Sequence, residues 1–481
     1  MLVENDHDLE LCIQELQSHR MRAKIHNVNQ DLLSKIDPKI ISKINQVITI
    51  STKHNCSIGI VGGFVRDLLL GNPSDDVDFV LFKGDLNKLT EILAEKMQGK
   101  IGKMSNQTMT TQLRFPDGIV FEFNSTRKER YEYPSRIPIV EKASIAEDIT
   151  RRDFTINALI LFGSKYIDVF NGTEDLRNAV LRTTKNPATV FQEDYLRILR
   201  AIRFACKLDF KIENDVKVGI KKSVENLLDV PHERIIDELK LALGAQPVKA
   251  FQLMAELRIL ETLFSQMRNI EIDRGIFLVS SLWDKIELKL QYLYNQKIND
   301  TTVILASILS ELQLDDVLEY SKQRTDYLRF QNIITLLKKY TFSNKEIKEI
   351  GQYIKNKDSL FGFIELSPSL LEMRLFLKEI GILLDNLIHL SLAENSTRKA
   401  PIFLSPLIEK LKQINEKQDL IHFVPELNGN EIEEIFGFKG REIGEVKLIL
   451  SIAIMNEEIS NTKEACEKYI KRKMFGEEEK E

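Results

Sequence analysis

The chain has 481 residues, of which 43% are hydrophobic and 29% charged, and its formal net charge at pH 7 is −5. This composition is ordinary for a globular protein, and the length predicts two to four domains. The acidic balance does not indicate a nucleic-acid-binding protein, yet it does not exclude a local basic groove.

The cysteines stand far apart, so they predict neither a disulfide framework nor a metal site; they are Cys12, Cys56, Cys206 and Cys466. We therefore expect a reducing, cytoplasmic location. The first twenty residues are charged and lack the apolar core of a secretory signal, and no apolar run is long enough to span a membrane.

The first part of the chain alternates between helix and strand patterns. Residues 1–35 predict an appended helical segment, whereas residues 125–150, which are charged and contain prolines, predict a loop. The other expected elements are helices at 38–55, 64–70 and 86–97 and strands at 58–61, 77–82, 110–115, 118–124, 157–163 and 165–172. From about residue 189 onward the pattern is helical almost throughout.

These patterns predict an α+β fold, in which an N-terminal head of mixed β-sheet and helices precedes an all-helical neck, body and tail. The expected domains are an N-terminal helical extension (1–35), the head (36–175), the neck (176–268), the body (269–392) and the tail (393–481).

Acidic residues crowd the start of the second predicted strand. Asp76 and Asp78 are two residues apart, so their carboxylates would share one strand face, while Asp75 would point the other way. Two such carboxylates repel each other unless one is protonated or a cation lies between them. Mg²⁺ is the expected cation, because it prefers oxygen ligands and is often completed by a phosphate.

A possible anion site lies just upstream of these acids. The turn at Gly62 and Gly63 would present backbone N–H groups, and Arg66 on the following helix would contact a phosphate. Glu122 of a later strand is a candidate third carboxylate. Together these residues predict a site for nucleotidyl transfer, and the alternative interpretation is a solvated strand end beside an ordinary turn.

Five segments resemble, in order, the motifs of class II tRNA nucleotidyltransferases (CCA-adding enzymes) and bacterial poly(A) polymerases. They are VGGFVRDLLLGNPSDDVDF (61–79), RRDFTINAL (151–159), IDVFNGTEDL (167–176), EDYLRILRAIRFA (193–205) and ERIIDELKLAL (233–243). The resemblance is strong over about 55–265 and weaker over 425–472. It implies a nucleotidyltransferase head domain and Mg²⁺-dependent addition of CCA, from CTP and ATP, to the 3′ end of tRNA.

The resemblance also implies roles for individual residues. Asp76 and Asp78 match metal-binding, catalytic aspartates, and Glu122 matches a third carboxylate less closely. The nucleotide-binding set is Gly62, Gly63, Arg66, Arg152, Asp153, Asp194, Arg197, Arg200 and Arg203. For Arg152 and Asp153 the alternative is a local salt bridge that stabilises the fold.

Base choice has a physical rationale at Asp194 and Arg197, which are three residues apart on a predicted helix and would be neighbours. Cytosine and adenine both present an amine donor beside a ring-nitrogen acceptor, whereas uracil and guanine present the reverse. A carboxylate accepts from the amine and an arginine donates to the ring nitrogen, so this pair would select C and A. The alternative is a surface salt bridge.

Segment 125–138 resembles the flexible loop of the family, with Arg127, Glu129 and Tyr131 in an R-x-E-x-Y pattern linked to the switch from C to A addition. Enzymes that add only CC tend to lack this pattern, so its presence favours a CCA-adding or an A-adding enzyme. A plain charged loop is the alternative. Poly(A) polymerase is also left open, although the G-R-R-F-like run of those enzymes has no match here.

The expected partner is the 3′ end of tRNA, held through its shape and phosphates. Basic positions for this contact lie within 219–223, 336–348 and 468–473, although each of these segments is also consistent with a solvated helix face. A catalytically silent RNA-binding relative is the alternative from another functional class, and the intact aspartates argue against it.

Overall fold

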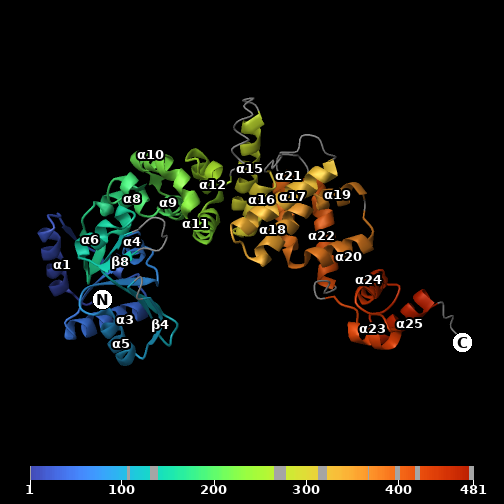
Figure 1. Ribbon diagram of the computed structural model, residues 1–481, viewed down its shortest axis with the longest axis horizontal. Coiled ribbons are helices and arrows are strands. Elements are labelled where there is room, and N and C mark those ends of the chain that lie inside the picture. Colours follow the sequence, from blue (N-terminus) through green and yellow to red (C-terminus); the bar gives the residue numbers. More distant parts are fainter. Residues whose placement is uncertain are drawn as a thin grey trace. The chain divides into compact units, whose positions relative to one another are not determined.

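The computed structural model describes residues 2–105, 109–130, 139–264, 278–311, 322–366, 368–395, 401–417 and 423–475. It divides into two compact units, residues 1–265 and 266–481, each described below by itself (Figure 1). The predicted neck–body boundary at 268/269 lies outside the described residues. The predicted boundaries at 175/176 and 392/393 are finer than this division and stay predictions.

Unit 1 contains a mixed β-sheet, as the sequence predicted. The strand order is β1-β10-β9-β2-β3-β6-β5-β4; β3 and β6 run parallel, and the other neighbouring pairs are antiparallel. The strands are β1 (Lys24–Asn27), β2 (Ser57–Val61), β3 (Val77–Lys83), β4 (Lys100–Ser105), β5 (Thr110–Arg114), β6 (Val120–Ser125), β9 (Ile160–Phe162) and β10 (Lys165–Asp168).

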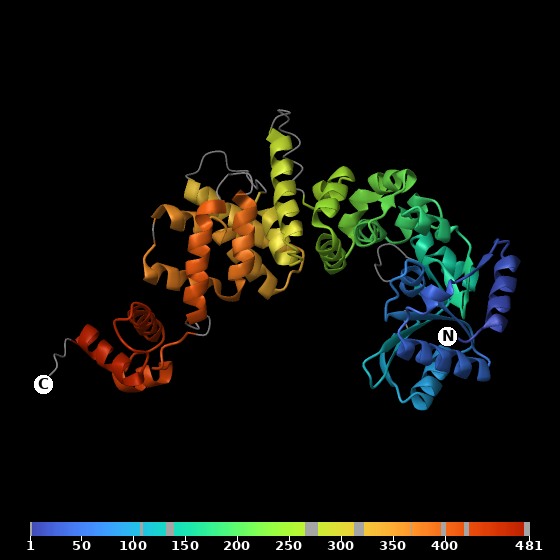
Figure 2. The same cartoon turned by 180° about the vertical axis from the view of Figure 1, so that it is seen from behind.

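Side-chain alternation separates the polar and apolar faces of the central strands. Phe79 of β3 stacks on Phe123 of β6 with ring centroids 4.9 Å apart, on the face opposite Asp78 and Glu122. Helices α3 (Pro38–Lys53) and α5 (Leu86–Lys96) lie together on one side of the sheet (Figures 1 and 2). The acidic side chains therefore point away from the phenylalanine core.

The N-terminal segment is part of the head, and the prediction that residues 1–35 are a helical appendage is wrong in two respects. Strand β1 extends the sheet by pairing with β10. Helix α1 (Asp6–Ser18) buries Leu9, Cys12 and Leu16 in a core that it shares with α6 (Ile145–Thr150) and with strands β2, β3, β9 and β10. The sequence shows the apolar face of α1 through its helical spacing, but it does not show that this face packs against α6 and the sheet.

The predicted loop at 125–150 contains three short elements. Strands β7 (Arg127–Arg130) and β8 (Ile139–Lys142) form a separate antiparallel pair, and α6 follows them. Ser144 and Glu147 form a capping box at the start of α6. This S-x-x-E pattern is a sequence signal for a helix start. It indicates α6 even though the charged composition of the segment favours a loop.

The neck is helical, as predicted, except for a two-stranded parallel pair between β11 (Val180–Leu181) and β12 (Lys211–Ile212). Helix α7 (Gly172–Arg177) spans the predicted boundary between head and neck, and the main neck helices are α8 (Pro187–Glu193), α9 (Arg197–Lys207), α10 (Asn214–Ser223), α11 (His232–Ala245), α12 (Pro247–Glu256) and α13 (Ile259–Leu263). The expected continuous helix through 193–205 is wrong, because Asp194 has extended backbone angles (φ −156°, ψ 107°) and separates α8 from α9.

Unit 2 is helical throughout its described residues, as expected. Its α-helices are α15 (Leu278–Asn295), α16 (Thr301–Leu309), α17 (Lys322–Lys339), α18 (Asn344–Asn356), α19 (Ser359–Leu366), α20 (Leu370–Ile380), α21 (Leu384–Asn395), α22 (Pro401–Lys417), α23 (Gly429–Phe436), α24 (Arg441–Met455) and α25 (Lys463–Phe475). Lys289 is buried and forms ion pairs with Glu311 and Glu394. Among the described helices, none combines the length and apolar character needed to cross a membrane.

Candidate active site

A cavity of about 590 Å³ in unit 1 brings most of the predicted site residues together. The predicted residues that line it are Gly62, Gly63, Arg66, Asp76, Asp78, Glu122, Arg127, Arg152, Asp153, Asp194, Arg197, Arg200 and Arg203. Its described lining carries nine cationic and six acidic side chains, so this acidic protein has a local excess of positive charge. Such a surface is suited to a polyanion.

The carboxylates gather at one end of this cavity. Asp78 of β3 lies in register with Glu122 of the neighbouring β6, whereas Asp76 immediately precedes β3 rather than lying on it. Burial, together with the nearby charges of Asp76 and Glu122 and against the opposing effect of Arg152, raises the pKa of Asp78 to about 7. Deprotonation of Asp78 therefore calls for a cation.

These oxygens fit Mg²⁺ when a substrate supplies further ligands. Within the described part of the chain, no group of three His, Cys, Asp or Glu residues is placed to hold a metal ion. Mg²⁺ does not need such a cage, because it usually keeps several waters and binds one or two carboxylates together with substrate phosphates. Asp76 and Asp78 provide that partial ligand set.

Gly62 allows the chain to approach these carboxylates closely. Its φ is +76°, and a Cβ atom there would lie 3.1 Å from Asp78 Oδ2. Glycine adopts this backbone conformation without strain. The turn thus directs α4 (Gly63–Leu69) along the cavity beside the acids.

Arg66 of α4 is almost fully buried and firmly anchored. Its Nε donates to Asp67 Oδ1 at 2.8 Å and its Nη1 donates to Asn157 Oδ1 at 2.7 Å. Arg66 is thus fixed both by its own helix and by Asn157, which comes from a distant segment. Asn157 was not among the predicted site residues.

Phe204 of α9 gathers three guanidinium groups and is another residue that the sequence did not single out. The Cζ atoms of Arg66, Arg200 and Arg203 lie 5.0, 5.4 and 4.2 Å from the centre of its ring. The electron-rich face of an aromatic ring attracts such cations. The ring thereby offsets part of the repulsion among like charges that would face a triphosphate.

Asp153 and Glu238 provide the opposing charge. Arg200 contacts Asp153 through Nη2 at 2.7 Å, and Arg203 contacts Glu238 of α11 through Nε at 2.6 Å. Burial alone would raise the pKa of Asp153, but the Arg200 guanidinium and the Asn157 amide hold it at about 2. Arg152 pairs with Asp148 of α6 and Asp153 pairs with Arg200 of α9, so both residues form salt bridges, but with other partners than a local Arg152–Asp153 pair.

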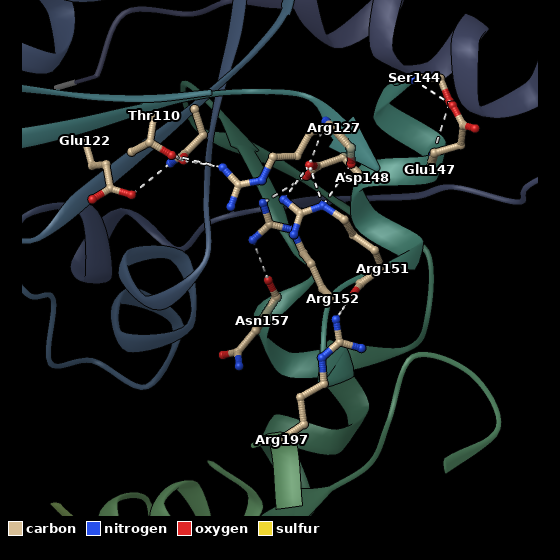
Figure 3. A network of polar contacts seen from close by, with 11 residues as sticks. Thr110, Glu122, Arg127, Ser144, Glu147, Asp148, Arg151, Arg152, Asn157 and Arg197 are labelled. Carbon is tan, nitrogen blue, oxygen red and sulfur yellow. Dashed lines mark hydrogen bonds and ion pairs between the residues drawn. The ribbon is translucent and has the colours of Figure 1, made fainter. Parts of the chain in front are cut away.

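Asp148 of α6 is the centre of a polar network that the sequence interpretation placed in a loop (Figure 3). Its buried carboxylate accepts from Arg151 Nη2 at 2.8 Å, from Arg152 Nη2 at 3.1 Å and from the backbone N–H of Arg127 at 3.2 Å. Asp148 lies four residues before Arg152, which follows the end of α6 and its C-cap Arg151.

The same network extends to the carboxylate cluster (Figure 3). Arg127 Nη1 donates to Thr110 Oγ1 at 3.0 Å and to Asn124 Oδ1 at 3.2 Å, and the amide of Asn124 donates to Glu122 Oε1 at 3.2 Å. Arg127 therefore connects β7 to the strand that carries Glu122. Of its predicted loop partners, Glu129 lies in β7 with its side chain outside the described part, and Tyr131 lies outside the described residues.

Asp194 and Arg197 line the same cavity but are not neighbours on one helix. Arg197 begins α9 and donates to Glu193 Oε2 at 2.7 Å and to the carbonyls of Arg151 and Val190 at 2.7 and 3.1 Å. Asp194 instead accepts from Arg234 Nη2 at 2.9 Å. The expected i, i+3 contact is wrong because the helix is broken at Asp194.

Comparisons with known proteins agree with this geometry. A sequence family described as the poly A polymerase head domain matches residues 58–182, and one described as the probable RNA and SrmB-binding site of polymerase A matches residues 209–270.

Two curated relatives come from bacteria. An A-adding tRNA nucleotidyltransferase of Aquifex aeolicus is 30% identical over 83% of this chain and 45% of its own length. A CCA-adding enzyme of Ligilactobacillus salivarius is 36% identical over 40% of this chain and 47% of its own length. The chain thus spans less than half of each of these relatives.

A solved structure of a CCA-adding enzyme with CTP covers 94% of this chain and 99% of that protein, with a TM-score of 0.62 and 23% identity. At this identity the likeness concerns the fold, which is a head with a mixed sheet followed by helical parts.

Proposed function

Because the chain belongs to the family of class II tRNA nucleotidyltransferases and bacterial poly(A) polymerases, we propose that it adds CCA to the 3′ end of tRNA from CTP and ATP. The observation that carries this proposal is the single cavity shared by the acids of β3 and β6, the arginines of α9 and Asp194.

The proposed reaction is a displacement at phosphorus. The terminal 3′-hydroxyl of tRNA attacks the α-phosphate of the nucleotide, a bond forms between the 3′-oxygen and that phosphorus, the hydroxyl proton is lost, and pyrophosphate leaves. Mg²⁺, held by Asp76 and Asp78, would stabilise the charge that develops on the phosphate oxygens. Glu122 lies beside this pair and adds negative charge that favours cation binding.

The triphosphate belongs at the arginine end of the cavity. Arg66, Arg200 and Arg203 are held there by Phe204, Asn157, Asp153 and Glu238, so their charge is positioned before the nucleotide binds. Arg152, beside Gly62 and Asp78, would contact the α-phosphate or the sugar. Preorganisation of this kind lowers the ordering cost of binding.

Base choice would rest on Asp194 and Arg197. In the proposed complex, the carboxylate accepts from the exocyclic amine of C or A and the guanidinium donates to the ring nitrogen. A wrong base would leave buried charged groups without partners, which costs far more than a missing apolar contact.

A-only addition is the second candidate. It is favoured by the A-adding relative from Aquifex aeolicus, whose similarity extends over 83% of this chain. CC-only addition and poly(A) synthesis share the chemistry but have no comparable support. The tRNA would contact basic positions in 219–223, 336–348 and 468–473, and we expect the protein to act in the cytoplasm.

The decisive experiment uses three tRNA transcripts that end before CCA, after C and after CC, each with Mg²⁺ and both CTP and ATP, of which one is labelled. A CCA-adding enzyme completes all three, and an A-adding enzyme extends only the third. Asp76→Ala should abolish incorporation while tRNA binding is largely retained. Long A tails, or no incorporation on any transcript, would contradict the proposal.

A further inference from the structure

Asp194 is held from two sides at the edge of the cavity. Its Oδ1 accepts from the backbone N–H of Leu196 at 3.0 Å, and its Oδ2 accepts from Nη2 of Arg234 at 2.9 Å. The first contact is local, whereas Arg234 reaches across from α11, forty residues later. The break between α8 and α9 leaves Asp194 outside both helices, so these contacts fix its direction.

The carboxylate retains acceptor capacity for a substrate. An ionised carboxylate has about four lone-pair sites, and these two contacts use two of them. Each oxygen thus keeps one site, and both Asp194 and Arg234 line the cavity. A fixed carboxylate can offer an acceptor at one place, whereas a mobile one can turn aside and tolerate a base that lacks the amine.

We propose that Arg234 is a positioning residue for nucleotide choice, which orients Asp194 so that its free lone pair meets the amine of cytosine or adenine. This inference rests on the proposed function, because it assumes that Asp194 accepts from the base. It adds a residue from α11 to the pair that the sequence suggested.

The contribution of Arg234 to selectivity can be separated from its contribution to stability. The Arg234 side chain is 45% exposed, whereas that of Asp194 is 16% exposed. Salt bridges with one solvent-exposed partner contribute little to the free energy of folding. Loss of Arg234 should therefore leave the fold intact and change mainly where the Asp194 carboxylate points.

The test compares Arg234→Ala and Arg234→Lys with the unaltered protein, measuring kcat/KM for CTP, ATP, UTP and GTP on the appropriate tRNA transcripts. Arg234→Ala should lower the preference for CTP over UTP about tenfold, which corresponds to a hydrogen bond of ordinary strength. Arg234→Lys should restore part of that preference. Lys217→Ala is the matched control, because it removes an ion pair with Glu256 between two other neck helices and should leave the preference unchanged.

A double-mutant cycle sharpens the result. In an Asp194→Ala background, Arg234→Ala should have no further effect on the preference, because the group it positions is gone. Equal losses for all four nucleotides, or an unchanged preference in Arg234→Ala, would overturn the inference while leaving the proposed function in place. If the unaltered protein incorporates no nucleotide, both the proposed function and this inference are wrong.

Discussion

Asp78 is a carboxyl group in a position that disfavours its charge. Burial, followed by the charges of Asp76 and Glu122, raises its pKa to about 7, compared with about 3.9 for an unperturbed aspartate. Because its pKa is higher in the folded state, protonated Asp78 makes its full contribution to the free energy of unfolding below about pH 4. This contribution is lost as the pH rises towards 7. A bound cation would reverse that loss, so protons and Mg²⁺ compete for this residue.

We therefore predict that Asp78→Asn unfolds at a higher temperature than the unaltered protein at pH 8 without Mg²⁺, because the amide carries no charge to bury. The difference should shrink as the pH falls from 8 to 5.5. Added Mg²⁺ should raise the unfolding temperature of the unaltered protein, more at pH 8 than at pH 5.5.

Scanning calorimetry at both pH values measures these shifts. The exposed neighbour Asp75 provides the control, and Asp75→Asn should respond to Mg²⁺ as the unaltered protein does. An equal response of Asp78→Asn to Mg²⁺ would show that this carboxylate does not hold the ion.

Helix α9 carries both the arginines that face the cavity and the aromatic ring that they contact. Arg200, Arg203 and Phe204 belong to it, and Arg66 approaches the same ring from α4. Cation–π contacts of this kind contribute roughly 0.5–2 kcal/mol each, depending on how far they are removed from water. The ring therefore adds to the ion pairs that Arg200 and Arg203 form with Asp153 and Glu238.

Phe204→Leu tests this arrangement, because it keeps an apolar side chain but removes the ring. We expect KM for the nucleotide to rise about tenfold, since 1.4 kcal/mol of lost positioning corresponds to that factor, while kcat changes less. Phe204→Tyr should restore the lower KM. Steady-state kinetics on tRNA checks both values, and a KM that stays the same in Phe204→Leu would show that the ring does not position the arginines for the nucleotide.

The elements that sequence patterns predicted well are those whose partners are close in the chain. Strands β2 and β3 and helices α3 and α5 have clear periodicity; α3 begins at Pro38, and the other three are followed closely by a glycine. Strand β1 was missed because it has only four residues and is defined by its pairing with β10. The break at Asp194 was missed because helical spacing continues on both sides of it, while contacts from Arg151 and Arg234 determine the local geometry.

Within the site, motif resemblance identified the residues that line the cavity but not the ones that hold them. Asp148, Asn157 and Phe204 act through arginines that come from other segments. Their roles depend on tertiary contacts, which a single sequence does not contain. Only Asp148 had a local signal, in the capping box of α6.

At the scale of the whole molecule, the two units have separate cores and separate buried polar features. Leu16 of α1 is fully buried in unit 1, and Lys289 of α15 is buried among glutamates in unit 2. Units with their own cores can unfold as separate transitions.

We predict two calorimetric transitions for the full chain. Leu16→Ala should lower the midpoint temperature of one of them, because it reduces the free energy of unfolding of that unit by about 2–5 kcal/mol. Lys289→Ala should lower the midpoint temperature of the other, at a cost of up to about 3–5 kcal/mol, because it removes the buried cation shared by Glu311 and Glu394 and leaves Glu394 with the longer contact to Lys357. CTP with Mg²⁺ should raise only the transition that Leu16→Ala lowers. A single transition shifted by both substitutions would show that the units unfold together.

The break between α8 and α9 has an evolutionary consequence. Asp194 lies in extended backbone that any amino acid can adopt, and its side chain lines the cavity, held by the Leu196 N–H and by the half-exposed Arg234. Arg197, in contrast, bonds to two carbonyls and a glutamate and cannot be replaced as freely. If Asp194 selects the base, as proposed, selection could alter nucleotide preference at this position while Arg197 keeps α9 bonded to the head and to α8.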